Sequence, residues 1–78
     1  MDVEHLVHMA NQIGQFFQAQ PDRAEAMEGI ATHIRKFWAP RMRQALARHI
    51  AAQAEGGAED GLLPIVREAL QVRADVLG

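Results

Sequence analysis

No cysteine occurs in the 78 residues of the chain, and this absence limits what the chain can fold into. It excludes disulfide bonds, thiolate metal sites, iron–sulfur ligation and a cysteine nucleophile. A chain of this length buries only roughly 60% of its unfolded surface, so its own core is marginal. Small folds of this size usually need a disulfide, a metal or a partner. We therefore expect another protein chain to stabilise this one.

Apolar residues recur at intervals of three and four along most of the chain, which is the period of an amphipathic helix. Helices are predicted at about residues 3–18, 21–38, 41–53 and 63–77, and no segment has the pattern of a strand. The predicted fold is all-α, a small bundle of four helices that forms a single domain over residues 1–78. The residues expected to face the core are Val3, Leu6, Ala10, Ile13 and Phe17, then Met27, Ile30, Ala31, Ile34 and either Phe37 or Trp38, then Met42, Leu46 and Ile50, and finally Ile65, Val66, Ala69, Leu70, Val72, Val76 and Leu77.

Three prolines mark where helices begin. Pro21, Pro40 and Pro64 are each expected in the first turn of a helix, where the missing N–H costs nothing. The residue before a proline avoids the α region, so the second and third helices should meet at a tight proline corner. The segment 55–61, rich in glycine and acids, is the clear loop. Gly29 either is tolerated inside its helix at a cost of about 1 kcal/mol or lets a neighbouring backbone pack close.

Basic residues gather in the middle of a chain whose net charge is −2. Between residues 35 and 48 there is no acid, and the basic residues are Arg35, Lys36, Arg41, Arg43 and Arg48. Three interpretations stay open: a solvated helix face with internal ion pairs, a surface that docks to acidic groups or to a phosphate-bearing cofactor in a partner, and a nucleic-acid-binding helix. The third is the least favoured, because nucleic-acid-binding domains usually carry a basic balance overall.

The aromatic residues form two adjacent pairs, Phe16–Phe17 and Phe37–Trp38. Neighbours in a helix point about 100° apart, so both members of a pair cannot face the core. One member of each pair should lie at the core edge or outside it. Aromatic side chains with arginine neighbours are typical of interface anchors. The alternative is that a small core wraps both members of each pair.

The sequence contains few of the residues that form a catalytic or metal-binding centre. Serine is absent and Thr32 is the only hydroxyl residue. His5 and His8 share a helix face but do not supply the ligands that a zinc site needs. We therefore expect no catalytic residue, no metal site and no cofactor bound by this chain. The acidic start at Met1–Glu4 and the lack of an apolar run of roughly 20 residues predict neither a targeting segment nor a transmembrane helix, so a cytoplasmic location is expected.

One string is specific enough to suggest a family: Phe37-Trp38-Ala39-Pro40-Arg41-Met42-Arg43, within residues 29–43. Together with the patterns of residues 5–17 and 61–69, it resembles the delta subunit of soluble, NAD-dependent, molybdenum-containing formate dehydrogenases. The resemblance covers nearly the whole chain. The Phe-Trp-x-Pro-Arg-Met-Arg string is its specific part, because helical patterning alone identifies no family.

The resemblance implies a complex that oxidises formate and passes the electrons to NAD. Its larger subunits carry the molybdopterin centre, the flavin and the iron–sulfur clusters, and the delta subunit carries none of them. The implied role is non-catalytic: assembly, molybdenum cofactor insertion or stabilisation of the complex by docking, with the molybdopterin-bearing subunit as the expected partner. The residues expected to bind this partner are Phe37, Trp38, Pro40, Arg41, Met42 and Arg43.

In this hypothesis Trp38 buries in a pocket of the partner, while Arg41 and Arg43 pair with carboxylates or with phosphates of the pterin cofactor. Two other classes stay open. One is a helical bundle that associates only with itself. The other is a small nucleic-acid-binding regulator that uses Arg41, Arg43 and Arg48.

Overall fold

The computed structural model describes residues 2–57 and 59–77, and it is helical with no strand among them. The helices are α1 (Val3–Phe17), α2 (Arg23–Phe37), α3 (Pro40–Gly56) and α4 (Pro64–Val72), followed by a short 3-10 helix, η1 (Ala74–Leu77). The predicted all-α fold with four main helices is confirmed.

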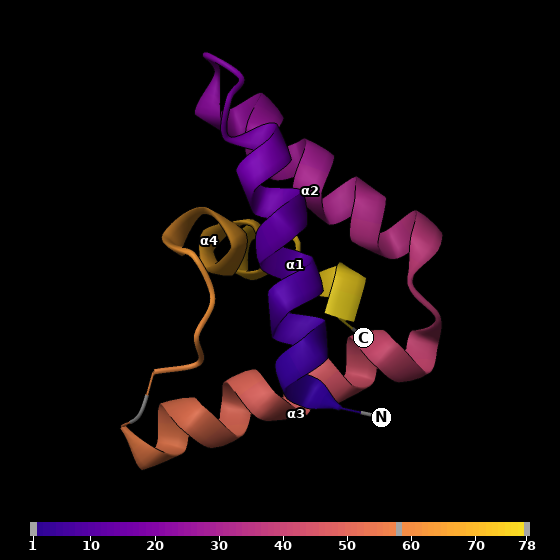
Figure 1. Cartoon of the computed structure of the whole chain (residues 1–78), viewed down its shortest axis with the longest axis vertical. Coiled ribbons are helices and arrows are strands. Elements are labelled where there is room, and N and C mark those ends of the chain that lie inside the picture. Colours follow the sequence, from indigo (N-terminus) through magenta and orange to yellow (C-terminus); the bar gives the residue numbers. More distant parts are fainter. Residues whose placement is uncertain (1, 58, 78) are drawn as a thin grey trace.

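Helix α1 lies against each of α2, α3 and α4 (Figure 1). The short helix η1 lies behind α1 in this view and packs against α2, α3 and α4. Helices α2 and α3 meet at a corner at the right of Figure 1, and the end of the chain returns into the space between them. The core lies between these elements, and its largest fully buried side chains are Ile30, Ile34, Leu46, Val66 and Val76. Each main helix gives at least one side chain to this shared core, and α1 contributes Leu6 and Ala10.

The first two helices begin at aspartate caps. A side-chain oxygen of Asp2 accepts a hydrogen bond from the Glu4 N–H at 3.0 Å. Asp22 does the same for the N–H groups of Ala24 and Glu25, at 2.9 and 3.3 Å. These contacts satisfy backbone donors that the first turn leaves free.

The aspartate cap also corrects the expected position of Pro21. This proline precedes the cap and lies outside α2, which begins at Arg23. The reason is that Asp22 binds two free N–H groups as the cap, whereas proline at the first helical position only avoids losing one. Pro40 and Pro64 do open their helices, as predicted.

The proline corner between α2 and α3 is confirmed. Trp38 (φ −91°, ψ 136°) and Ala39 (φ −64°, ψ 150°) are both extended, and they separate the two helices. The Ala39 carbonyl then accepts from the N–H groups of Met42 and Arg43, at 2.9 and 3.2 Å. The chain therefore changes direction within two residues and enters α3 at once.

The last predicted helix is broken at Arg73, where φ is −111° and ψ is 57°. The break turns Val76 into the core, and the Val76 carbonyl accepts a hydrogen bond from Arg43 Nη1 at 3.0 Å. Val72, expected to face the core, is instead 67% exposed, because it lies on the outer side of α4 just before the break. The apolar pattern alone predicts a continuous helix to residue 77, but the tertiary contacts of η1 outweigh this preference and break the helix.

The loop between α3 and α4 is held by a buried carboxylate. The Arg67 guanidinium donates to both Asp60 side-chain oxygens, at 2.7 and 3.1 Å, and the Leu62 N–H donates to Asp60 Oδ1 at 3.0 Å. The hydrogen bond from Arg67 lowers the pKa of the Asp60 carboxyl below its ordinary value, and burial opposes this shift. Asn11 adds a contact from α1, donating to the Gly61 carbonyl at 3.0 Å and accepting from the Leu63 N–H at 2.9 Å.

The loop begins two residues later than the predicted segment 55–61. Helix α3 continues through Gly56 and ends at Gly57, whose φ of 71° gives a left-handed cap. Glycine adopts this conformation without the steric cost that other residues meet. Ala58, which was also expected in the loop, lies outside the described residues.

Candidate protein-docking groove

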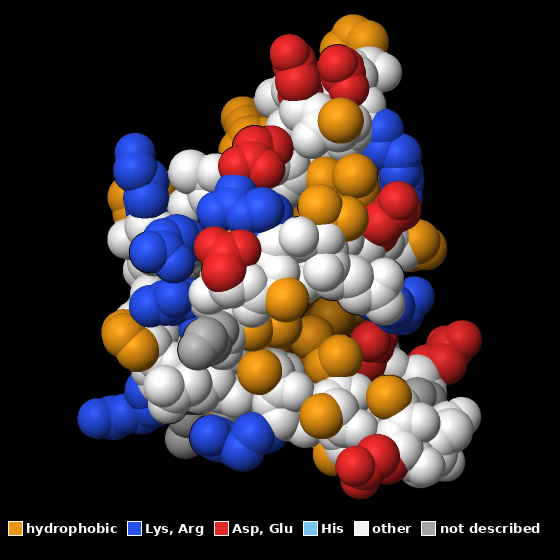
Figure 2. Space-filling view, turned by 180° about the vertical axis from the view of Figure 1, so that it is seen from behind, with side chains coloured by type: hydrophobic (Ala, Val, Ile, Leu, Met, Phe, Trp, Pro, Cys, Tyr) orange, Lys and Arg blue, Asp and Glu red, His pale blue; other side chains and the backbone are white. Residues whose placement is uncertain are grey.

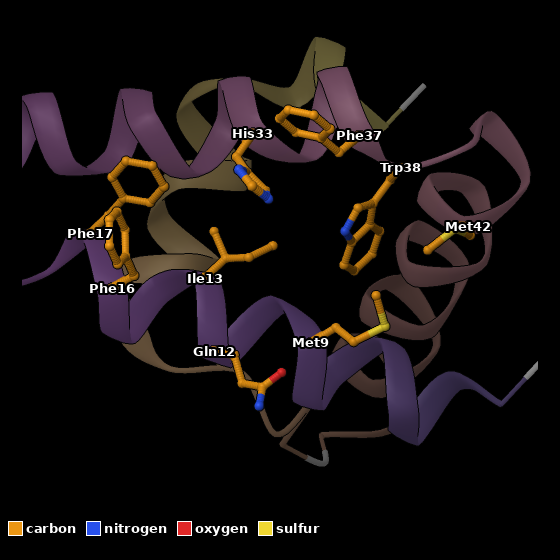
Figure 3. A pocket seen from close by; sticks show the side chains of 9 residues that line it. All are labelled: Met9, Gln12, Ile13, Phe16, Phe17, His33, Phe37, Trp38 and Met42. Atoms are coloured by element: carbon orange, nitrogen blue, oxygen red, sulfur yellow. The ribbon is translucent and has the colours of Figure 1, made fainter.

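An open groove of roughly 510 Å³ runs between α1 and α2 and ends at the start of α3. We call it the aromatic groove. Its lining is mostly apolar and consists of Met9, Gln12, Ile13, Phe16, Phe17, His33, Phe37, Trp38 and Met42. Phe16 and Phe17 lie at one end of it, Trp38 and Met42 at the other, and Ile13 lies between them (Figure 3).

The groove arises because α1 and α2 each carry a second apolar row beside the row that faces the core. On α1 this row is Met9, Ile13 and the phenylalanine pair, next to the buried Leu6 and Ala10. On α2 it is His33 and Phe37, one helical turn apart. The sequence placed Ile13 and Phe17 among the expected core residues and left Phe16 undecided between core and surface, so the α1 wall was not predicted. The sequence does contain a signal for this wall, because the apolar stripe of α1 is wider than a single row of buried side chains requires.

Phe16 and Phe37 are large apolar side chains that remain outside the core. They are 74% and 71% exposed, whereas Phe17 is half-buried. The prediction that one member of each aromatic pair lies at the core edge or outside is confirmed. Large apolar groups in this position cost free energy in water unless something covers them.

Aromatic rings join the two walls of the groove. The Phe16 and Phe17 ring centroids are 5.1 Å apart in an edge-to-face arrangement. Phe17 lies 6.3 Å from the His33 ring, which in turn lies 4.7 Å from Phe37. Such contacts fix ring orientation within a pair. The exposed rings are therefore held in place by their half-buried neighbours.

Gly29 explains how Phe17 approaches α2 so closely. A Cβ atom built at Gly29 would lie 2.5 Å from Cε1 of the Phe17 ring. The expectation that a neighbouring backbone might pack here is wrong, because the close neighbour is a side chain from α1. Glycine at this position leaves room for the ring that forms the end of the groove.

Trp38 does not serve as a free anchor. Its side chain is 5% exposed and belongs to the chain's own core, so in this structure it offers no exposed ring to a partner's pocket. The physical reason is the proline corner. Trp38 caps α2 in an extended conformation, and its indole turns back toward α1, where it closes one end of the aromatic groove (Figure 3).

The other predicted partner-binding residues are divided by the corner. Phe37 and Met42 line the aromatic groove. Pro40 and Arg43 instead line a smaller hollow of roughly 300 Å³, together with Asp75. Arg41 is exposed and lines neither of them. The structure therefore does not gather the predicted set into one site.

Basic side chains gather along the edge formed by the end of α2 and the start of α3, at the left of Figure 2. Two of them are used within the chain. Arg35 lies 3.8 Å from a carboxylate oxygen of Asp75, and Arg43 donates to the Val76 carbonyl. Lys36, Arg41 and Arg48 form no ion pair within residues 2–57 and 59–77. We call Lys36 and Arg41 the basic corner.

In the part of the chain that the structure describes, two other kinds of site lack their defining features. No cluster of three or more histidine, cysteine or carboxylate side chains is close enough to hold a metal ion there. No helix in the described ranges is long and apolar enough to cross a membrane. The aromatic groove and the adjoining basic corner are thus the principal surface features to explain.

Comparison with known proteins identifies the family. The family model described as the delta subunit of NADH-dependent formate dehydrogenase, FdsD, matches residues 5–70. No curated protein and no solved structure matches the chain. The matched residues include both walls of the aromatic groove and the basic corner. The chain therefore belongs to the FdsD family of formate dehydrogenase delta subunits.

Proposed function

We propose that the chain docks onto the larger subunits of a formate dehydrogenase through the aromatic groove, in the cytoplasm, and that it binds no cofactor itself. Membership of the delta-subunit family makes it an accessory subunit rather than the catalyst. The docking supports assembly, molybdenum cofactor insertion or stability of the complex. The proposed partner is the subunit that carries the molybdopterin centre.

The observation that carries the proposal is the pair of exposed phenylalanines beside an apolar groove. Phe16 and Phe37 are each more than two-thirds exposed, at 74% and 71%. Covering a phenylalanine side chain contributes roughly 1.5–3 kcal/mol relative to leaving it in water. A partner that covers both rings gains this energy without reorganising the core, since neither ring belongs to it.

The test is co-expression with the dehydrogenase subunits, using the wild-type chain, Phe16→Ser and Phe37→Ser. Purification through a tag on a larger subunit reports how much of the chain is retained. We expect both variants to be largely lost from the complex while the isolated variants keep wild-type helicity by circular dichroism. Retention of both variants at the wild-type level would contradict docking through this groove.

The same preparations separate the possible roles. Loss of subunits from the complex indicates a role in assembly or stability. A complex of normal subunit composition with less molybdenum per mole indicates a role in cofactor insertion. Formate oxidation should fall in proportion to whichever of these quantities falls, because the chain contributes no catalytic group.

Self-association is the second candidate, and the same apolar groove supports it. Sedimentation of the isolated chain tests it. A stable homodimer that does not exchange into the dehydrogenase would favour self-association over docking. Nucleic-acid binding has weaker support, because few cations in the described ranges lack a partner and the net charge is −2.

A further inference from the structure

We infer that the aromatic groove receives an amphipathic helix of a larger subunit, with apolar anchors in the groove and carboxylates against the basic corner. This inference rests on the proposed docking function and adds the chemistry of the segment that is bound. It follows from three properties of the groove: the hydrogen-bonding state of its walls, the apolar lining and the charge around it.

The walls exclude an extended peptide. Both long walls are α-helices, α1 and α2, and the backbone N–H and C=O groups in the middle of a helix already bond to each other. A bound strand would find no main-chain partners there, and its own buried polar groups would stay unsatisfied, which disfavours binding. A helix brings its backbone hydrogen bonds with it. The occupant that suits an apolar groove between helices is therefore another helix.

The lining suits the apolar face of such a helix. Phe16 and Phe37 extend into solvent beside the groove, and Met9 and Met42 line its far end. Methionine side chains are flexible and adapt to the shape of what packs on them. Helix-in-groove recognition uses anchors at positions i, i+3 or i+4, and i+7. We expect two or three such anchors to fill the space between Phe17 and Trp38.

The charge around the groove indicates which charged residues the bound helix carries beside its apolar anchors. No Asp or Glu occurs between Glu28 and Glu55, so the part of α2 that follows Glu28 and the start of α3 carry no acid. Lys36 and Arg41 lack an ion-pair partner within the described residues. A neutral or basic helix would leave these cations without partners or repel them. Asp or Glu side chains beside the anchors would pair with them, and Arg41 could bind a carboxylate through two hydrogen bonds.

A second copy of the chain fits this charge pattern less well. Symmetric pairing places the same surface on both sides of the interface. The groove lining contains no acid, so a copy docked groove to groove would bring no carboxylate of that lining to either basic corner. A segment of a different protein can supply what the chain itself lacks at this surface.

Site-specific photocrosslinking in the assembled dehydrogenase tests the inference. The probe benzoyl-phenylalanine replaces Phe37 in one preparation and Val72, exposed on the outer side of α4, in a matched control. After irradiation of the purified complex, mass spectrometry identifies the crosslinked peptide. We expect the Phe37 probe to capture one segment of a larger subunit that has helical apolar periodicity and at least one Asp or Glu, and the Val72 probe to capture little. Crosslinking of the Phe37 probe to a second copy, to an acid-free segment or to nothing would overturn the inference.

Charge reversal gives an independent measurement. Arg41→Glu should weaken retention of the chain in the complex about tenfold, whereas Arg48→Glu, the same charge change at an exposed arginine about two turns further along α3 that also forms no ion pair within the described residues, should change it less than twofold. Mutating the acid in the captured segment to Lys should restore retention of Arg41→Glu. Equal effects of the two reversals, or no rescue, would contradict carboxylate pairing.

Failure of the inference and failure of the proposed function look different. If Phe37→Ser is lost from the complex but Arg41→Glu is retained, the groove docks a partner and the acidic helix is wrong. If the wild-type chain itself does not co-purify with the dehydrogenase, both are wrong.

Discussion

Two sides of this small bundle use their charged and apolar residues in opposite ways. On the side of α4 and η1, charges are paired internally: Arg67 binds Asp60, and Arg73 bonds to Glu28 and Asp75. On the side of the aromatic groove, phenylalanine rings are exposed and the basic corner has no internal carboxylate. The charged residues of the first side are used in contacts within the fold. The second side leaves apolar rings and cations exposed, and a partner could cover them. The strongly exposed aromatic rings are therefore confined to one side of the part of the chain that the structure describes.

The largest effect should come from removing an exposed ring. Phe37→Ala should weaken binding to the complex by at least about 2 kcal/mol, roughly thirtyfold, because a buried aromatic anchor is lost. The stability of the isolated chain should change by less than about 0.5 kcal/mol, because the ring is already in water. Quantitative co-purification and urea unfolding measure the two. Val72→Ala, at an equally exposed site on the other side, is the control and should change neither.

Asp60→Asn should have the opposite effects: it should lower the stability of the isolated chain and leave binding to the complex nearly unchanged. The side chain of Asp60 is only 8% exposed, and its loss of charge leaves the Arg67 guanidinium without its ionic partner. We expect unfolding free energy to fall by about 1–3 kcal/mol, the usual cost of leaving such a group without its bond. Urea unfolding of the full chain checks this, with the exposed neighbour substituted in Glu59→Gln as the control. A variant as stable as wild type would show that the closed side does not depend on this carboxylate.

Acid should weaken the closed side through the same group. The folded-state pKa of Asp60 is lower than the unfolded value because Arg67 binds its ionised form. Its contribution is therefore fully present above the ordinary carboxyl pKa of about 3.9 and is lost as pH falls through the lower folded-state pKa. Urea midpoints measured from pH 6 down to pH 2.5 should decline less in Asp60→Asn than in wild type. If the urea midpoints of wild type and Asp60→Asn declined in parallel, the acid sensitivity would not arise from Asp60.

The smallest effect on stability should come from Gly29→Ala. The new methyl group displaces the Phe17 ring, but alanine gains about 1 kcal/mol of helix propensity over glycine. Because the ring is half-buried and can move, unfolding free energy should change by less than about 1 kcal/mol, while the shape of the groove changes. The ring shift should appear in the aromatic NMR signals, and retention in the complex should fall modestly. Strong destabilisation would instead place Phe17 in the essential core.

Local patterns in the sequence predicted much of the fold. Apolar spacing located all four helices, and Pro40 and Pro64 marked the starts of α3 and α4. The break at Arg73 was not predictable in this way. It depends on contacts with residues distant in the sequence, including the bond from Arg43 to the Val76 carbonyl. Pro21 was misplaced because the stronger helix-start signal was its neighbour, Asp22.

The candidate site was harder to predict than the fold. The rule that neighbouring side chains diverge in a helix correctly separated Phe16 from Phe17. For the second pair, the sequence could not decide whether Phe37 or Trp38 turns outward. Trp38 leaves the helical conformation at the corner, so helical geometry no longer fixes its direction. The groove itself combines rows from two helices, and only tertiary packing brings those rows together.

Hydroxyl-radical footprinting of the chain, alone and within the purified dehydrogenase, tests the central claim most directly. We expect oxidation of Phe16 and Phe37 to fall at least fivefold in the complex, and oxidation of Val72 to stay unchanged. Equal oxidation of both phenylalanines in the free chain and in the complex, with protection of Val72 instead, would contradict docking through the aromatic groove.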